Sequence, residues 1–571
     1  MPNTSDETGV AYHGGIEWPL YNEKTGKPST TPTNKSVWIA ALKALVDAFS
    51  SDNERNSIVS AEVIECAMKL VKKFESQPSS EWRKGYIDLL HEFGIIMASC
   101  EPKGSLIMAC AGLSCLNSSM VISTKKGEND TEKVSAQDVV MKDGIVELLP
   151  ISTLIINGGN SNSDVTVMKK FEMASPHHDE KGKNMVAKGE MMKQQLSKWA
   201  EYGCIETSAA ESASKIADLE DCHSSLVKDK VFVLLGATSA MGPAEVLIQL
   251  GATIAAVARP GKKLAALEEM VKNGPSEATM LLPQVGGDGA AGADLIRHAP
   301  ELARWIAGLC PEKKLVICNL AYLDGEKNVL AGVGMDLIID YVCQKRQYTA
   351  ISYIISPATV HVVTEEAAMD AKRRYDSAPF WHSLCMVQAS NTWREKTVSG
   401  LRVLNGLSSL QGPNYALTKT AQQWRAMVSY FSIPDGNKHI VSANHGPPTR
   451  SESMVGHKTI AIALEGMQNF EPNVAFDVSC SKTLLTALML YDINFDESTA
   501  NPMSPEKTVQ HPMCLFNENS AHGGSWRCPY LQDSIGTASF ITGKVKKTCE
   551  SRAGNKCPEG SLGPRPDNVQ T

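Results

Sequence analysis

The stretch Val231-Phe-Val-Leu-Leu-Gly236-Ala-Thr-Ser-Ala-Met-Gly242-Pro-Ala-Glu-Val-Leu247 decides the fold that the sequence predicts. An apolar, β-rich run stops at a turn of small residues and continues into a helical pattern, which is how a dinucleotide-binding site begins. Glycine at 236 permits a tight turn, and glycine at 242 lets the following helix pack close to a sheet. Backbone N–H groups at the start of that helix would then face a pyrophosphate. The alternative interpretation is that the small residues serve tight packing alone.

Further apolar runs follow in the order that a parallel sheet needs. Residues 251–259 predict a second buried strand, which ends in Arg259 where an NAD site usually places an acidic residue for the ribose hydroxyls. An arginine there favours the 2′-phosphate of NADPH. Residues 315–319 and 348–356 predict two more buried strands, each closed by a polar residue at the carboxyl edge of the sheet, where ligands bind.

Tyr415 and Lys419 lie four residues apart in a predicted amphipathic helix, so they share one face. A lysine at this spacing can hold the nicotinamide ribose, and its charge is expected to lower the pKa of the phenol from about 10 toward the working pH. The tyrosine can then give a proton to a carbonyl oxygen while a reduced nicotinamide gives a hydride. The alternative is an ordinary helix with a solvent-exposed lysine.

Residues 228–492 resemble a short-chain dehydrogenase/reductase, and their pattern is most similar to the ketoreductase domain of fungal-type fatty acid synthases. Besides Gly236, Tyr415 and Lys419, the resemblance includes residues 440–450, which are similar to the strand and Pro-Gly-rich loop that closes over the nicotinamide in that superfamily. It implies an α/β fold with a doubly wound parallel (Rossmann) sheet, NADPH as cofactor, and homo-oligomerisation through the Tyr415 helix. The cofactor-binding residues that it implies are Gly236, Thr238, Ser239, Met241, Gly242, Arg259, Asn319, Ala321, Lys419, Pro447 and Thr449.

The resemblance also implies a catalytic serine at the end of the fifth strand, which donates a hydrogen bond to the substrate carbonyl. Ser356 ends a predicted strand but is separated from Tyr415 by a long insertion, whereas Ser409 is nearer in sequence and follows a turn signal. We expect Ser356 to complete the site with Tyr415 and Lys419, and Ser409 is the alternative if the insertion displaces the strand edge.

The chain departs from the pattern of the superfamily in other places. Ala240 stands where the turn usually has its central glycine, and residues 318–321 only partly match the usual Asn-Asn-Ala-Gly. Residues 334–341 contain no clear counterpart of the superfamily's proton-relay asparagine.

The expected function is the NADPH-dependent reduction of a carbonyl substrate. The resemblance implies a 3-oxoacyl or polyketide-type thioester, free or bound to an acyl carrier. The departures support an alternative, a catalytically inactive reductase-like scaffold or regulatory protein. A third possibility is an epimerase or dehydratase that uses the same tyrosine and lysine.

Composition excludes several other classes. The 571 residues are 43% hydrophobic and 21% charged with a net charge of −7, and no basic stripe indicates a nucleic-acid partner. The longest apolar runs have the length of strands, so we expect no membrane span. The 15 cysteines show no metal-ligand spacing, which favours reduced core residues, no metal site and a cytoplasmic location.

We expect five segments. Residues 1–35 predict a flexible arm, 36–157 an N-terminal helical or α+β domain, and 158–225 a linker with helices. Residues 226–495 form the predicted NADP-binding domain. Its insertion at 360–412 is interpreted as a lid, an acyl-chain wall, a dimer contact or the underside of a long loop. Residues 496–571 predict an irregular C-terminal extension and tail, with His522 at the surface.

Overall fold

The computed structural model describes residues 13–51, 58–125, 131–159, 165–286, 290–347, 349–394, 396–431, 439–504 and 508–552. The first twelve residues of the predicted arm and the predicted tail beyond residue 552 lie outside the described residues.

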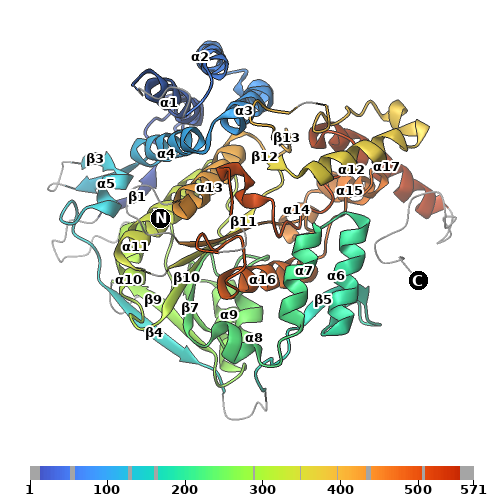
Figure 1. Ribbon diagram of the computed structural model, residues 1–571. Coiled ribbons are helices and arrows are strands. Elements are labelled where there is room, and N and C mark those ends of the chain that lie inside the picture. Colours follow the sequence, from blue (N-terminus) through green and yellow to red (C-terminus); the bar gives the residue numbers. More distant parts are fainter. Residues whose placement is uncertain are drawn as a thin grey trace.

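A seven-stranded mixed sheet lies at the centre of an α/β molecule (Figure 1). Its strand order is β14-β11-β10-β7-β8-β9-β4, and all neighbours are parallel except β4, which runs antiparallel to β9 at one edge. The strands are β4 (Ile151–Asn157), β7 (Lys230–Leu235), β8 (Thr253–Val257), β9 (Thr279–Val285), β10 (Lys314–Asn319), β11 (Ala350–Ile355) and β14 (Ile440–His445).

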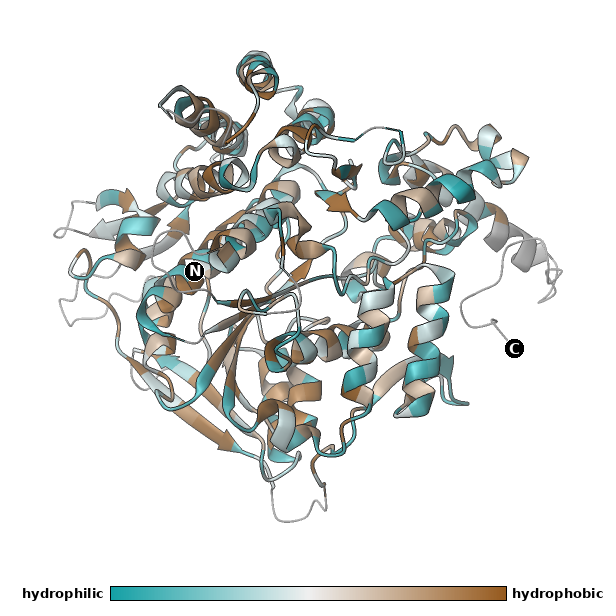
Figure 2. Ribbon diagram, viewed as in Figure 1, coloured by the Kyte–Doolittle hydropathy of each residue, from teal (hydrophilic) through white to brown (hydrophobic). Residues whose placement is uncertain are grey.

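Helices cover both faces of this sheet because its inner strands are apolar on both sides. Every residue of β7 is buried, as expected for a central parallel strand. Val231 and Val233 pack in one hydrophobic cluster with α10 (Ala299–Gly308), α11 (Glu326–Lys345) and α13 (Pro413–Phe431). Phe232 and Leu234 pack in a second cluster with α8 (Ala244–Gln249), α9 (Lys262–Lys272) and α16 (Val478–Asn494). Figure 2 shows the corresponding concentration of apolar residues in the strands.

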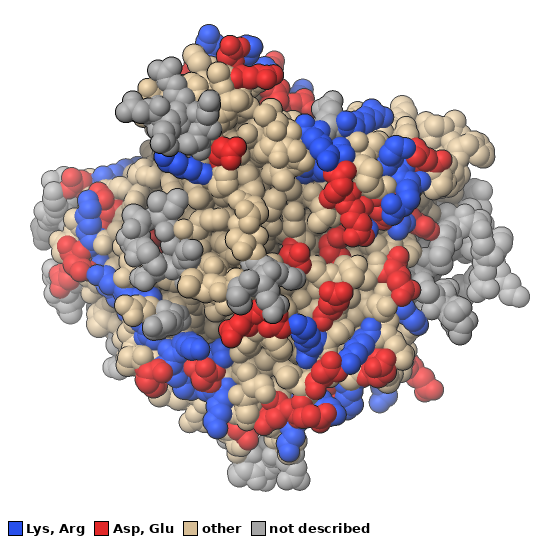
Figure 3. All heavy atoms as spheres, viewed as in Figure 1, with Lys and Arg blue, Asp and Glu red and all other residues tan. Residues whose placement is uncertain are grey.

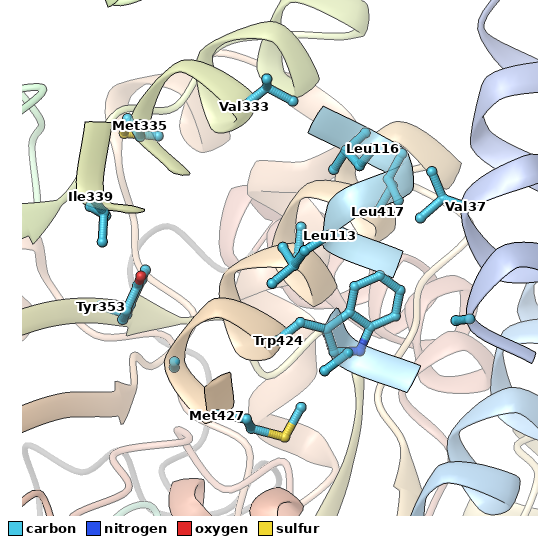
Figure 4. Packing of buried hydrophobic residues seen from close by; sticks show 14 of the residues in the cluster. Val37, Leu113, Leu116, Val333, Met335, Ile339, Tyr353, Leu417, Trp424 and Met427 are labelled. Atoms are coloured by element: carbon cyan, nitrogen blue, oxygen red, sulfur yellow. The ribbon is translucent and has the colours of Figure 1, made fainter. Parts of the chain in front are cut away.

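Four N-terminal helices form a layer, and three of them, the first, third and fourth, pack on the outer face of α13. The four helices are α1 (Thr30–Ser51), α2 (Ala61–Ser76), α3 (Trp82–Ser99) and α4 (Pro102–Ser119). In Figure 4, Trp424 and Leu417 of α13 lie beside Leu113 of α4. A Cβ atom at Gly112 of α4 would lie 2.3 Å from Trp424 Cζ3, so this close approach of the two helices requires glycine. The face of α13 on which the expected oligomerisation relies is therefore buried under the chain's own helices.

The region before β7 differs from the expected arrangement. Residues 13–35 do not all form an arm, because β1 (His13–Glu17) pairs with β2 (Val121–Lys125), Trp18 is fully buried and α1 begins at Thr30. Strand β4 joins the central sheet although the N-terminal domain was predicted to extend to residue 157. The remaining elements here are β3 (Thr131–Ser135), α5 (Ala136–Met141), β5 (Met173–His178), β6 (Asn184–Ala187), α6 (Glu190–Tyr202), α7 (Thr207–Ala217) and a π-helical turn at His223–Val227.

The two ends of the predicted insertion at 360–412 lie side by side. They form β12 (Val360–Val363) and β13 (Arg402–Asn405), which pair antiparallel with Val360 opposite Asn405. Between them lie the expected charged helix α12 (Glu365–Asp376) and a 3₁₀ helix at Phe380–Cys385.

The predicted irregular C-terminal extension is in fact a packed part of the molecule. Trp526 and His522 are fully buried, and His522 is not at the surface as expected. Its Nε2 lies 2.8 Å from Glu206 Oε1, and Arg527 binds the same carboxylate. Further elements of this half are α14 (Glu452–Val455), α15 (Lys458–Gly466), α17 (Gln532–Arg552) and 3₁₀ turns at Met467–Asn469 and Pro512–Phe516.

None of the helices that the structure describes combines the length and the apolar character needed to cross a membrane.

Candidate active site

The carboxyl ends of the central strands meet at one edge of the sheet. Asn319 at the end of β10 is in register with Leu235 of β7, and Ile355 of β11 is in register with His445 of β14. Ser356 follows β11 directly, and Tyr415 lies in the first turn of α13. This edge therefore collects residues that are far apart in the sequence.

Tyr415 Oη donates a hydrogen bond of 2.9 Å to Ser356 Oγ. The two residues are 59 positions apart, and the pairing of β12 with β13 returns the chain to this edge after the insertion. Of the two serines considered, Ser356 is thus the one that contacts the tyrosine. The backbone N–H of Ser409 donates instead to Asp533 Oδ1 at 2.7 Å.

Lys419 lies one helical turn beyond Tyr415, and its Nζ is 5.9 Å from the centroid of the tyrosine ring. The ammonium donates a hydrogen bond of 3.0 Å to Gln422 Oε1. Gln422 Nε2 in turn donates to Asn319 Oδ1 at 2.8 Å. Both Tyr415 and Lys419 remain partly exposed, so a ligand at this edge can reach them.

Burial controls the protonation of this pair. Desolvation raises the pKa of Tyr415 to about 12, and the hydrogen bond with Ser356 offsets only part of that rise. The pKa of Tyr415 is therefore raised, not lowered as expected from the neighbouring Lys419. Desolvation also lowers the pKa of Lys419 to about 8.

The predicted dinucleotide turn begins as expected at Gly236. This residue has a φ of +100°, and a Cβ atom there would lie 2.6 Å from the backbone nitrogen of Ala321, so only glycine fits. Gly242 is buried, and a Cβ there would lie 3.3 Å from Leu320 Cδ1. Ala240 is exposed with no left-handed backbone, so alanine replaces the usual glycine there without strain.

The helix after this turn is short. It begins at Ala244 and has six residues. Thr238, Ser239 and Met241 of the turn are partly exposed.

Arg259 lies two residues beyond the end of β8. Its side chain is 68% exposed, and its Nε lies 3.8 Å from Asp294 Oδ2. Such an exposed ion pair is weak, so the guanidinium can bind an incoming phosphate.

Asn319, Pro447 and Thr449 face into the protein. Asn319 is 5% exposed and is bonded to Gln422. The Thr449 hydroxyl donates to the Pro447 carbonyl at 2.9 Å and lies 2.7 Å from Ser481 Oγ. A ligand would therefore contact mainly the backbone groups of these residues. Ala321 beside them is partly exposed.

Two residues of the site were missed from the sequence. Tyr322 is half exposed and meets the Tyr415 ring edge-on, with centroids 6.0 Å apart. Gln422 bridges Lys419 and Asn319. Its position three residues beyond Lys419 on one helical face was the available signal.

On the face seen in Figure 3, basic and acidic residues are interspersed around uncharged areas. Among the described residues, no group of three or more His, Cys, Asp or Glu side chains is arranged to hold a metal ion.

Comparison of the chain with models of known protein families, with curated proteins and with solved structures finds no match.

Proposed function

We propose that this protein is an NADPH-dependent reductase of a carbonyl compound. The observation that carries the proposal is the hydrogen bond of 2.9 Å between Tyr415 and Ser356 at the carboxyl edge of the sheet, with Lys419 one turn away. Two hydroxyl groups that converge in this way suit a carbonyl oxygen, which accepts a hydrogen bond from each.

The strand order supports a doubly wound, Rossmann-type sheet. Across the sheet the parallel strands run β9, β8, β7, β10, β11 and β14, which in chain order are the third, second, first, fourth, fifth and sixth. This is the order of dinucleotide-binding sheets, which bind their ligands beside the first and fourth strands.

The residues present fit NADP. The turn at Gly236 lies so close to the backbone of Ala321 that a Cβ atom at position 236 does not fit. The exposed Arg259 suits a 2′-phosphate. The bound cofactor would supply the hydride. Tyr415 gives its proton to the carbonyl oxygen, and the charge of Lys419 stabilises the resulting phenolate. A proton from solvent then restores the phenol, so one carbonyl, one NADPH and one proton yield an alcohol and NADP⁺.

The substrate we propose is a 3-oxoacyl or polyketide-type thioester, on the strength of the sequence resemblance. We place the protein in the cytoplasm, in keeping with the absence of any disulfide among the cysteines that the structure describes. Homo-oligomerisation, if it occurs, would use a surface other than the covered face of α13.

A reductase-like scaffold without activity is the second candidate. The high pKa of Tyr415 and the pairing of Asn319 and Thr449 inside the protein favour it. Such a scaffold would bind a nucleotide or a partner without turnover.

Titration with NADPH and then assay with 3-oxoacyl thioesters separates the two candidates. For the reductase, Ser356→Ala lowers kcat/KM about 10²-fold or more because it removes one donor to the carbonyl. Ser409→Ala is the matched control and leaves the rate unchanged. Binding of NADPH without turnover of any carbonyl substrate would favour the scaffold, and equal effects of the two serine substitutions would refute the assigned site.

A further inference from the structure

Gln422 forms a buried bridge between the lysine of the site and the end of β10. Its Oε1 accepts from Lys419 Nζ at 3.0 Å and its Nε2 donates to Asn319 Oδ1 at 2.8 Å. Gln422 is 6% exposed and Asn319 is 5% exposed. An ammonium has donors only, so the amide oxygen of Gln422 must face Lys419, which fixes the orientation of the amide.

Lys419 depends on this amide. Desolvation is the cause of its lowered pKa, and among the described residues no carboxylate forms an ion pair with it. The carboxylate of Asp336 on α11 is bonded to Arg425 at 2.7 Å and to Asn117 at 2.7 Å, so it is already paired. Gln422 is thus the partner that holds the ammonium in place.

Little space is left behind Gln422. A void of about 10 Å³ lies between Gln422, Asn319, Thr418 and residues of α4 and α11. That volume is at the lower limit for a single water, so the amides of Gln422 and Asn319 bind each other directly.

We propose that Gln422 is a positioning residue for Lys419. Its neutral amide anchors Lys419 beside Tyr415 without neutralising the positive charge. This proposal rests on the proposed function. A carboxylate at position 422 would cancel the charge that stabilises the Tyr415 phenolate, and an aliphatic side chain would leave the ammonium without its acceptor.

The test measures the titration of Lys419 directly in the full-length protein. The protein is labelled with a trace of acetic anhydride at a series of pH values. Only the neutral amine reacts, so the acetylated fraction of the peptide containing Lys419, measured by mass spectrometry, reports the fraction of neutral Lys419. The parent midpoint is expected near pH 8. Gln422→Glu raises the midpoint by about one unit or more, because an opposite charge favours the ammonium. Gln422→Met lowers it by about half a unit to one unit, because a hydrogen bond to the charged form is lost.

Gln423→Met is the matched control. Gln423 neighbours Gln422 on α13 and is equally buried, but its Nε2 donates to Thr359 Oγ1 at 3.1 Å. Its substitution leaves the Lys419 midpoint unchanged. Thermal melts identify any variant that fails to fold, and the isosteric Gln422→Glu then decides alone. If the Lys419 midpoint in the folded Gln422 variants equals that of the parent, the proposal is overturned.

Acetylation needs no turnover, so its result is independent of the reductase proposal. If the parent reduces a carbonyl substrate, kcat can also be measured against pH. The pH at which kcat falls on the alkaline side should then move with the Lys419 midpoint, to a higher pH in Gln422→Glu and to a lower pH in Gln422→Met. An alkaline fall that stays in place while the midpoints move would contradict the positioning role.

Discussion

At the scale of single residues, the site is governed by burial. Lys419 has a lowered pKa and Tyr415 a raised one because both lose water, and the sequence pattern of a tyrosine followed by a lysine gave no sign of this. The requirement for glycine at 236 was predictable from short-range geometry, and Ser356 was expected in the site because it ends a predicted strand. The Gln422 bridge was not, because a side-chain amide selects its partners only once α13 is placed against β10.

Burying Lys419 has a cost that depends on pH. Its folded pKa of about 8 lies below its unfolded value, so the unfolded chain binds the proton more readily. The cost is fully present below about pH 8 and disappears as the pH rises through the unfolded value of about 10.4. Lys419→Met should therefore raise the free energy of unfolding near neutral pH by about 1–3 kcal/mol, less the lost bond to Gln422. Urea denaturation near pH 7 and near pH 10 checks this; a variant that is less stable near pH 7 would contradict it.

At the scale of elements, long-range pairing is what the sequence left open. The insertion at 360–412 was recognised, but nothing local reveals that β12 and β13 pair and return Tyr415 to Ser356. The segment after α16 contains small and polar residues typical of a loop, yet it is buried because Glu206, far away in the chain, binds His522 and Arg527. Partners so distant in sequence leave no periodic signal.

The same segment covers two neighbouring buried histidines. The ring centroids of His361 and His445 are 4.6 Å apart, and Trp526 packs against both rings. Neither nitrogen of His445 has a hydrogen-bond partner among the described residues. Burial lowers the pKa of His361 to about 3 and that of His445 well below its usual range, with His522 adding repulsion.

Acid should therefore destabilise the protein through these rings. Because the folded pKa values are depressed, the unfolded state takes up protons first, and stability falls as the pH drops below about 6.5. His445→Phe should reduce the loss of stability between about pH 7 and pH 5 by about 1–2 kcal/mol. Urea midpoints of parent and variant at both pH values measure this. An identical pH dependence in the two proteins would show that His445 does not carry the effect.

At the scale of the whole molecule, the N-terminal helices cover one side of the central α/β unit. Helices α1, α3 and α4 pack on α13, so the aromatic face of α13 is part of the interior (Figure 4). The amphipathic patterns of these helices were visible in the sequence. Their docking site was not, because an apolar stripe does not show which surface a helix packs against.

Trp424 is the centre of this contact. It packs edge-on against Trp38 at 5.2 Å and touches Gly112. Trp424→Ala should lower the free energy of unfolding by about 3–5 kcal/mol, since it leaves a cavity between α13 and α4. Phe380→Ala is the control, because Phe380 is 83% exposed and its loss should change stability by less than about 0.5 kcal/mol. Similar effects of both substitutions on chemical denaturation would mean that the N-terminal helices are not docked on α13.

In the proposed reaction, Tyr415 gives a proton to a carbonyl while a nicotinamide gives the hydride. The most direct measurement uses NADPH deuterated at the transferable position of the ring, a 3-oxoacyl thioester, and mass spectrometry of the product. We expect the parent to give a 3-hydroxyacyl thioester with one deuterium on the former carbonyl carbon. Tyr415→Phe should form this product at a rate about 10²- to 10⁴-fold lower. Equal labelling by the parent and Tyr415→Phe, or no labelled alcohol from the parent, would contradict it.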